Sequence, residues 1–583
     1  MMLAPDRLLV PGESPLIARL HEVDCARQLD GAACDGTSDG ALPFVGEIVH
    51  HVPGSVIGVR RRLSLAEDLY LADHHFVCAP GVKPLSACFP VVPMTVSLEI
   101  MAQAAACLAP EQGLTGFADV TATRWIALAD TDQLALRIEC RLEHADPARQ
   151  LRRIAAAVFV EGEAQPSISA KLMFGKLYQV GLPFNVAQPV AGHRLAAAQL
   201  YAQRELFHGP RFQCLDDAIV LGPEGAAARL RVRAPLDWFG STRQPQLLTD
   251  PALLDGVGQL MAVWAMQRER AVFPIGLGQM ELYGPTPAPG TSVPIRMAIS
   301  PGASKMLSAD VEIEDGAGAI WMRIKAWKSW QFQWDRALLD FRRQPTFYLL
   351  SDAQALPAPD AGARCQRITA RRIARFDRAL LARHYLRMDE MAQFFAFAGA
   401  PERQLQWLLG RITAKDAARA WRARHGGGAA MLHPAAFAVE NDARGQPRVA
   451  GWPDDAPPAL SIAHCEDQAI ALAHEDQTGV DIERVAERAA TFLRAVTSEA
   501  ERELLSAFAG AARNEWITRL WCAKEAMGKL MGTGLNQAPQ RFEAQTLYAD
   551  GAIAMLHGGS GRHARVTTIH DGHFMIAFAL SPD

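Results

Sequence analysis

Two long apolar segments, residues 94–108 and 251–266, lie inside a region of the sequence that otherwise alternates as β-strands do. The strand-like runs include residues 134–142, 155–161 and 228–232. The first and last of these alternate apolar and charged residues, as half-buried antiparallel strands do, whereas the middle run is continuously apolar and fits a more buried strand. Both long segments have helical length and few charges, so we expect two buried helices. The pattern predicts a duplicated fold in which a sheet wraps a helix.

A second region follows residues 352–363, which are rich in Ala, Pro and Asp and are interpreted as a linker. The sequence then becomes helical, for example at residues 405–424, and strand-like runs return at residues 459–463, 469–473 and 479–483. This pattern predicts a separate, mixed α/β region. A chain of 583 residues is in any case too long for one hydrophobic core.

The composition excludes several classes of protein. Apolar residues make up 49% and charged residues 21%, and the formal net charge of -4 provides no basic field for nucleic acid. No stretch has the pattern of a secretory signal or reaches the roughly 18 apolar residues that span a bilayer. The ten cysteines form no CxxC pair, so neither a disulfide framework nor a zinc knuckle is indicated. We therefore expect a cytoplasmic protein that binds neither nucleic acid nor membrane.

Asp481 and Glu483 are the first candidate site residues. On a strand, residues two apart point to the same face, so both carboxylates would lie on one side. Like charges so close raise each other's pKa unless a cation compensates, and Mg²⁺ prefers oxygen ligands. On spacing alone, a solvated strand edge carrying two acids is the more common arrangement.

A second stretch adds a third carboxylate. Trp521, Glu525 and Lys529 follow a four-residue spacing, so on a helix they share one face. Glu525 could complete a three-carboxylate magnesium site, and Lys524 and Lys529 could neutralise phosphate oxygens. The alternative is a surface helix with a Glu525–Lys529 ion pair worth a few tenths of a kcal/mol.

These two stretches, residues 479–483 and 521–529, resemble the two signatures of the surfactin-type 4'-phosphopantetheinyl transferases. Further matches lie upstream in the family's order, at residues 408–416, 445–447 and 461–465, with Gln446 where the family has lysine. The resemblance covers about residues 365–583 and implies a pseudo-twofold α/β domain. In this family coenzyme A donates its phosphopantetheine arm to a serine of an acyl carrier protein.

The resemblance also implies roles for individual residues. It places Mg²⁺ on three carboxylates, those of Asp481, Glu483 and Glu525. It assigns phosphate contacts to His464, Lys524 and Lys529, and the nucleotide end of coenzyme A to Arg411 and Lys415. Glu525 or a metal-bound water would deprotonate the carrier serine, and Lys529 would protonate the leaving group.

Asp255 and Gln259 form the candidate site of the first region. They lie four residues apart in one of the predicted buried helices, where Asp255 has Leu253 and Val257 as apolar neighbours. A buried carboxylate is costly unless it is paired or protonated, and a raised pKa would make Asp255 a usable general acid. The alternative is an aspartate that caps the start of the helix.

Residues 42–335 resemble the double-hotdog dehydratase domains of polyketide and polyunsaturated fatty acid synthases. The matching motifs are Asp73-His74, Pro93, residues 206–213 and residues 254–259. The resemblance implies that His74 removes the α-proton of a 3-hydroxyacyl thioester. It also implies that Asp255, assisted by Gln259, protonates the departing hydroxyl. Cys78 stands where the family usually has glycine.

We therefore predict an α+β chain with a double-hotdog domain followed by a transferase domain. The expected parts are a weakly ordered segment (1–41), two hotdogs (42–190 and 191–345), a linker (346–364) and the transferase (365–583). Such a chain would prime an acyl carrier protein with coenzyme A and Mg²⁺ and dehydrate the carrier-bound acyl group in polyketide or fatty acid biosynthesis. It could form a homodimer through the dehydratase.

Two other hypotheses stay open. The first half could be a catalytically silent docking module beside an active transferase. Alternatively, the whole chain could be a non-catalytic scaffold.

Overall fold

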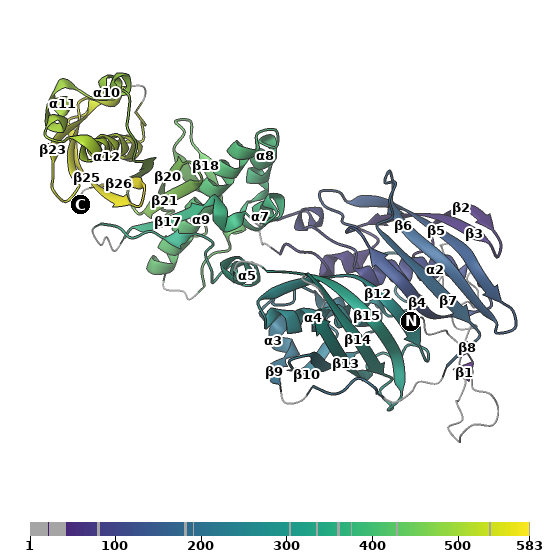
Figure 1. Cartoon of the computed structure of the whole chain (residues 1–583). Helices are drawn as coiled ribbons and strands as arrows, with labels where there is room; N and C mark the ends of the chain where they lie inside the picture. Colours follow the sequence, from purple (N-terminus) through teal and green to yellow (C-terminus); the bar gives the residue numbers. More distant parts are fainter. Residues whose placement is uncertain are drawn as a thin grey trace. The chain divides into compact units, whose positions relative to one another are not determined.

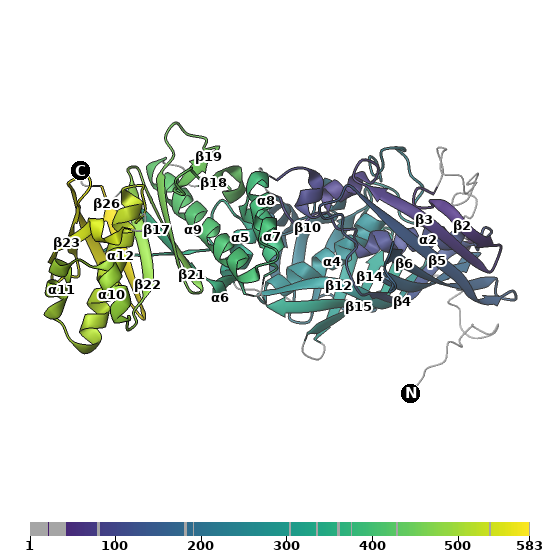
Figure 2. The same ribbon diagram turned by 90° about the horizontal axis from the view of Figure 1, so that it is seen from above.

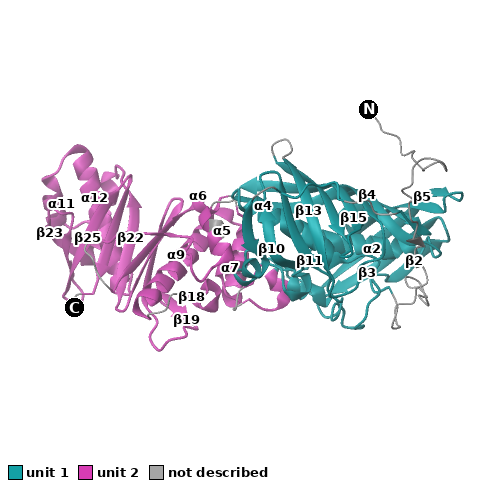
Figure 3. Cartoon of the chain, turned by 90° about the horizontal axis from the view of Figure 1, so that it is seen from below, with its two compact units in different colours: residues 1–76, 89–333 teal, residues 77–88, 334–583 magenta. Residues whose placement is uncertain are grey.

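The computed structural model describes residues 21–22, 42–78, 82–179, 184–189, 192–301, 305–333, 336–357, 362–374, 376–426, 430–535 and 538–581. The chain forms two compact units, one of residues 1–76 and 89–333 and the other of residues 77–88 and 334–583 (Figure 3). The predicted weakly ordered segment, 1–41, lies outside the described residues apart from β1 (His21–Glu22). None of the described helices is long and apolar enough to cross a membrane.

The first unit is built on one antiparallel sheet of thirteen strands. Its first half contains, in spatial order, β2 (Glu47–Val52), β3 (Val56–Ser64), β5 (Gln133–Asp146), β6 (Leu151–Val160), β7 (Ile168–Gly175) and β4 (Gly113–Ala122). The second half continues with β12 (Arg270–Leu282), β15 (Ile320–Gln333), β14 (Met306–Glu314), β13 (Ser292–Pro301), β11 (Gly225–Arg231), β10 (Leu215–Leu221) and β9 (His193–Ala196). The halves join where β4 pairs with β12.

Each half of this sheet holds one buried helix (Figure 1). α2 (Met94–Ala106) packs on β5, β6 and β7, and α4 (Pro251–Met266) packs on β10, β11 and β12. Almost every residue of both helices is buried, and the two helices contact each other. The structure thus confirms the expected double sheet-wraps-helix architecture. The short elements of this unit are β8 (Leu177–Tyr178), α3 (Ala197–Ala202), η1 (Leu69–Asp73) and η3 (Pro210–Phe212).

The described part of the second unit contains two larger sheets, each covered by one long helix (Figure 2), and a separate hairpin of two strands. α9 (Pro401–His425) covers β16 (Asp352–Ala353), β17 (Arg364–Thr369), β21 (Gln468–His474) and β20 (Ala459–Cys465). α12 (Gly510–Leu530) covers β22 (Thr478–Arg484), β26 (Phe574–Leu580), β25 (Arg562–Asp571), β24 (Ile553–His557) and β23 (Phe542–Leu547). Strand β20 lies beside β22, so the two sheets meet there. This pair of helix-covered sheets fits the expected pseudo-twofold α/β domain.

Shorter elements complete the second unit. They are η2 (Leu85–Cys88), α5 (Arg336–Arg343), α6 (Ala370–Ile373), α7 (Arg378–Tyr385), α8 (Met388–Ala396), η4 (Pro434–Ala436), β18 (Ala438–Asn441), β19 (Pro447–Ala450), α10 (Ala490–Val496), α11 (Glu499–Ser506) and η5 (Pro539–Arg541).

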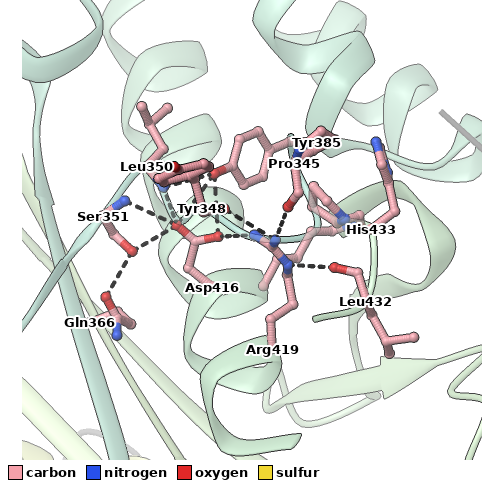
Figure 4. Close-up of polar contacts among 12 residues, drawn as sticks. Pro345, Tyr348, Leu350, Ser351, Gln366, Tyr385, Asp416, Arg419, Leu432 and His433 are labelled. Carbon is pink, nitrogen blue, oxygen red and sulfur yellow. Dashed lines mark hydrogen bonds and ion pairs between the residues drawn. The ribbon is translucent and has the colours of Figure 1, made fainter. Parts of the chain in front are cut away.

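A buried polar network ties part of the predicted linker, 346–364, to α9 (Figure 4). The Asp416 carboxylate accepts hydrogen bonds from the backbone amides of Leu350 and Ser351, both at 3.0 Å, and from the Ser351 hydroxyl at 2.7 Å. Arg419 pairs with Asp416 at 2.8 Å and donates to the Leu432 carbonyl at 2.6 Å. Both charged side chains are fully buried. This segment is therefore more firmly held than its composition predicted.

Replacing Asp416 with alanine is expected to destabilise the second unit by about 3–5 kcal/mol, because it leaves Arg419 buried without its counter-ion. Urea unfolding followed by intrinsic fluorescence would measure the change. Asp454→Ala, which breaks an exposed ion pair with Arg422, is the matched control and should leave the midpoint almost unchanged. Equal midpoints for the two variants would contradict the account.

Two candidate active sites

The first site lies in the first unit, where α4 meets two loops. Asp255 and Gln259 are one turn apart on α4, His74 follows η1, and His208 comes just before η3. Asp250, not Asp255, caps the helix, since its side chain accepts a hydrogen bond from the Leu253 amide at 2.9 Å. Asp255 is thereby free of the capping role that the sequence left open.

These side chains form a connected polar group. The reactive atoms of His74, His208 and Asp255 all lie within 4.8 Å of one another. Oδ2 of Asp255 is 3.1 Å from Nε2 of His208 and accepts a hydrogen bond from Nε2 of Gln259 at 2.8 Å. The Tyr201 hydroxyl donates to the Gln259 carbonyl oxygen at 2.6 Å, which fixes the orientation of the amide.

His74 is arranged as a neutral base. Its Nδ1 lies 2.7 Å from the Val91 carbonyl, and a carbonyl can only accept, so Nδ1 carries the proton and Nε2 keeps a free lone pair. Burial lowers the pKa of His74 to about 4, and the neighbouring His208 acts in the same direction. The imidazole is therefore uncharged, and able to accept a proton, at neutral pH.

The charge state of Asp255 differs from the sequence-based expectation. Burial alone would raise its pKa, but His208, His74 and the Gln259 hydrogen bond together outweigh burial, and the pKa falls below the ordinary value of 3.8. The raised pKa that would make Asp255 a simple general acid is therefore not found in the ligand-free protein, because the nearby imidazoles favour the carboxylate.

An apolar pocket adjoins this group and has a volume of about 110 Å³. It is lined by His74, His208, Asp255 and Gln259 together with aromatic side chains, namely Phe76, Trp125, Phe207 and Phe273. The Phe76 and Phe207 rings are 5.1 Å apart, and the Trp125 and Phe273 rings 4.9 Å. Cys78 is not among the described lining residues of this pocket. The pocket suits an acyl chain placed against a base and a carboxylate.

The lowered pKa of His74 predicts a pH dependence. Because the imidazole stays neutral above pH 4, the acid limb of kcat/KM for dehydration should lie near pH 4, not near the ordinary value of 6.5. A pH–rate profile from pH 4.5 to 7, with circular dichroism to exclude unfolding, should show no half-maximal point within this range. An acid limb centred near pH 6.5 would contradict this arrangement.

The second site lies in the second unit, between β22 and α12. Strand and helix approach so closely that a Cβ on Gly479 would lie 1.9 Å from the Ala526 carbonyl, which explains the glycine there. This contact brings Asp481 to α12, where Lys529 donates to Asp481 Oδ1 at 2.8 Å and to the Val480 carbonyl at 3.0 Å. Asp481 Oδ2 is buried and has no hydrogen-bond partner among the described residues.

Glu483 and Glu525 complete the predicted carboxylate group. Glu483 accepts hydrogen bonds from Trp521 Nε1 at 3.1 Å and from Arg488 at 2.8 Å. Burial, followed by the charge of Asp481, raises the pKa of Glu525 to about 6. Of the described residues, only His74, His208 and Asp255 have three ligand atoms within 4.8 Å of one another, so these carboxylate oxygens are spread more widely.

The donor set of this second site fits Mg²⁺. All three side chains offer hard carboxylate oxygens, and an unbonded buried oxygen of Asp481 together with the raised pKa of Glu525 marks a local excess of negative charge. The Lys529 and Arg488 cations partly compensate this charge in the ligand-free protein. A divalent cation would compensate the remainder.

Of the two predicted coenzyme A contacts, His464 lies near Lys529, which pairs with Asp481. A Cβ on Gly410 would be 2.3 Å from the His464 ring, so α9 runs directly past His464 at the end of β20. Desolvation of the ring, followed by the charges of Lys529 and Arg411, lowers the pKa of His464 to about 4. Arg411 is buried on α9, and its Nε lies 3.9 Å from Glu390. His464 is therefore close to both cations, while Arg411 also has an internal partner.

Lys415 and Lys524 require a correction. Lys415 is fully buried, paired with Glu390 at 2.6 Å and bound to the Pro434 carbonyl at 3.0 Å and the Phe437 carbonyl at 2.5 Å. Lys524 is likewise buried and contacts Glu501 at 2.7 Å, the Val496 carbonyl at 2.9 Å and the Pro539 carbonyl at 3.2 Å. Three acceptors use all three N–H bonds of each ammonium. In this structure both lysines form internal ion pairs and have no N–H left for a ligand phosphate.

The sequence reasoning gave no role to His208, Tyr201 or Arg488. His208 is part of the matched motif at residues 206–213, so its position was marked but its contact with Asp255 was not. Tyr201 contacts Gln259, 58 residues further along the chain, which no local pattern encodes, whereas Arg488 lies only five residues after Glu483.

Comparison with known proteins gives two family matches. Residues 182–332 match the polyketide synthase dehydratase N-terminal domain, and residues 477–579 match the 4'-phosphopantetheinyl transferase superfamily. The first match includes Asp255, Gln259 and His208 but not His74, and the second includes all three carboxylates. No curated protein matches the sequence significantly.

Solved dehydratase domains resemble the chain over about half its length. The domain of PpsC from Mycobacterium tuberculosis, solved with C12:1-CoA, is 17% identical with a TM-score of 0.38, covering 50% of this chain and 99% of that chain. The domain from the CurF module of curacin polyketide synthase is 16% identical with a TM-score of 0.36, covering 50% of this chain and 100% of that chain. The two family matches thus show one region, residues 182–332, that is similar to polyketide synthase dehydratase domains and another, residues 477–579, that is similar to the 4'-phosphopantetheinyl transferase superfamily.

Proposed function

We propose that this chain transfers 4'-phosphopantetheine from coenzyme A to a serine of an acyl carrier protein, and that it also dehydrates a 3-hydroxyacyl group carried by that protein. The observation that carries the transferase proposal is the meeting of Asp481, Glu483 and Glu525 with Lys529, inside a region matched by the transferase superfamily. The carboxylates are suited to bind a cation, and the lysine is suited to bind a phosphate ester.

Asp481, Glu483 and Glu525 would hold Mg²⁺, which when bound would neutralise charge on the pyrophosphate of coenzyme A. The transfer would release adenosine 3',5'-bisphosphate from coenzyme A. Lys529 lies beside Asp481 and would donate a proton or a hydrogen bond to this leaving group. His464 and Arg411 would contact the remaining phosphates. Glu525, or a water held beside it, would accept the proton of the carrier serine.

The dehydratase proposal rests on His74 and Asp255 at the apolar pocket. Nε2 of His74 would take the α-proton, and the electrons of that C–H bond would form the Cα=Cβ double bond. The Cβ–O bond would break as a proton from the Asp255 side reaches the departing oxygen, so that water leaves. The apolar lining excludes bulk water from the pocket and favours this elimination.

Two assays test the proposal. In the first, the protein is incubated with fluorescent coenzyme A, Mg²⁺ and an apo acyl carrier protein, and the carrier should become labelled. In the second, a 3-hydroxyacyl carrier is supplied and formation of the conjugated enoyl thioester is followed by mass spectrometry. Label transfer without dehydration of any 3-hydroxyacyl chain would favour the silent docking module, and absence of both activities would favour the scaffold.

A further inference from the structure

The pairing of His208 with Asp255 bears on how the departing hydroxyl receives its proton. This inference rests on the proposed dehydratase function. The departing hydroxyl needs a proton, but Asp255 is held as a carboxylate by the imidazoles beside it. Both His208 and Gln259 contact the same oxygen, Oδ2. Gln259 cannot supply a proton, since an amide does not titrate. His208 is the titratable group in direct contact with Asp255.

His208 is held rigidly for such a role. Its ring stacks on Phe207 with the ring centres 4.0 Å apart, and its carbonyl accepts a hydrogen bond from Gln213 at 3.0 Å. The following loop is clamped to Asp73, which accepts from the Gly209 amide through its carbonyl oxygen at 2.7 Å and from the Arg211 guanidinium through Oδ2 at 2.8 Å. These hydrogen bonds fix the backbone at His208, and the stacking on Phe207 orients the ring beside Asp255.

The second ring nitrogen of His208 is available for a proton. Nδ1 is buried and has no hydrogen-bond partner among the described residues, so a proton can bind there without breaking an existing bond. Protonation would also convert a buried carboxylate with a net negative charge into a neutral ion pair, which low-dielectric surroundings favour. The charged or titratable groups around the pair are Asp73, His74, His75, Tyr201 and Arg211.

We propose that His208 and Asp255 act as one proton donor, in which His208 stores the proton and Asp255 delivers it to the departing hydroxyl. As the Cβ–O bond breaks, the Nε2 proton of His208 passes to Asp255, and Asp255 delivers one proton to the departing hydroxyl oxygen, which leaves as water. The pair then has one proton fewer and His74 one more. Exchange with solvent restores both. His208 acts through Asp255 and is a positioning and proton-storing residue.

The test is the pH–rate profile of dehydration by the full-length His208→Gln variant. Glutamine can still donate a hydrogen bond to Asp255 but cannot store a proton. At pH 7.5 kcat/KM should fall by about 100-fold, within the usual contribution of acid catalysis. The rate should recover toward acidic pH, where Asp255 itself binds a proton. A variant within threefold of wild type, or a loss that is equal at every pH, would overturn the proposal.

A spectroscopic measurement keeps the proposal testable if this variant does not fold. The ring nitrogens of His208 are observed by NMR at pH 7.5 in wild-type protein carrying ¹⁵N-labelled histidine, and again in Asp255→Asn. The proposal predicts that both ring nitrogens carry a proton in wild type and that only one does in Asp255→Asn. The same protonation state in the two proteins would overturn it. An inactive wild type with different protonation states would instead refute the dehydratase function and leave the coupling intact.

Discussion

Asp481→Asn is expected to reduce label transfer from coenzyme A to the carrier protein by about 100-fold or more. Asp481 is buried between β22 and α12, its Oδ1 orients Lys529, and its Oδ2 is the buried oxygen that lacks a partner. Asparagine preserves the shape but removes the charge that would attract Mg²⁺. The measurement is the initial rate of carrier labelling at saturating fluorescent coenzyme A with varied Mg²⁺.

The control for this variant is Asp454→Asn, at an exposed aspartate that pairs with Arg422. It should label the carrier at the wild-type rate. Dehydration by Asp481→Asn should also be unchanged, because this activity depends on the other site. Wild-type label transfer by Asp481→Asn would refute the assignment of the carboxylate group as the metal site.

His74→Ala is expected to lower the rate of dehydration by roughly 10²–10⁴-fold, the usual contribution of general base catalysis. His74 is the pocket-lining base whose pKa of about 4 and anchored Nδ1 keep Nε2 ready for a proton. The measurement is kcat/KM for a 3-hydroxyacyl carrier or its pantetheine analogue. Label transfer by the same preparation should be unaffected.

His144→Ala, at an exposed histidine on β5, is the matched control and should dehydrate like wild type. A His74→Ala protein that keeps the wild-type rate would show that the base lies elsewhere. If the wild-type protein dehydrates no 3-hydroxyacyl chain, the result favours the silent docking module and contradicts the proposed role of His74.

The main architecture could be predicted because it depends on local patterns. The α4 segment begins and ends where the apolar run does, at Pro251 and Met266, and α2 likewise starts at Met94. Asp481 and Glu483 share a face of β22 because alternation along a strand fixes it. Trp521 and Glu525 share a face of α12 because they are four residues apart, which is about one helical turn.

The misassigned residues depend on contacts that are distant in the sequence. Lys415 and Lys524 lie in helices, where a lysine is usually exposed. Here both are buried, because Lys415 pairs with Glu390 and Lys524 pairs with Glu501. The charge of Asp255 likewise depends on His208, which a separate loop supplies. A sequence motif can identify such positions, but only the three-dimensional structure shows which residue each charged side chain contacts.

We propose that one chain both loads a carrier protein and dehydrates what it has loaded. To test this, the wild-type protein is supplied with apo carrier, 3-hydroxyacyl-coenzyme A and Mg²⁺, and the mass of the carrier is followed. The carrier should gain the acyl-phosphopantetheine group and then lose one water. A carrier that stays in its apo form, or that is loaded but never loses water, would contradict the proposal.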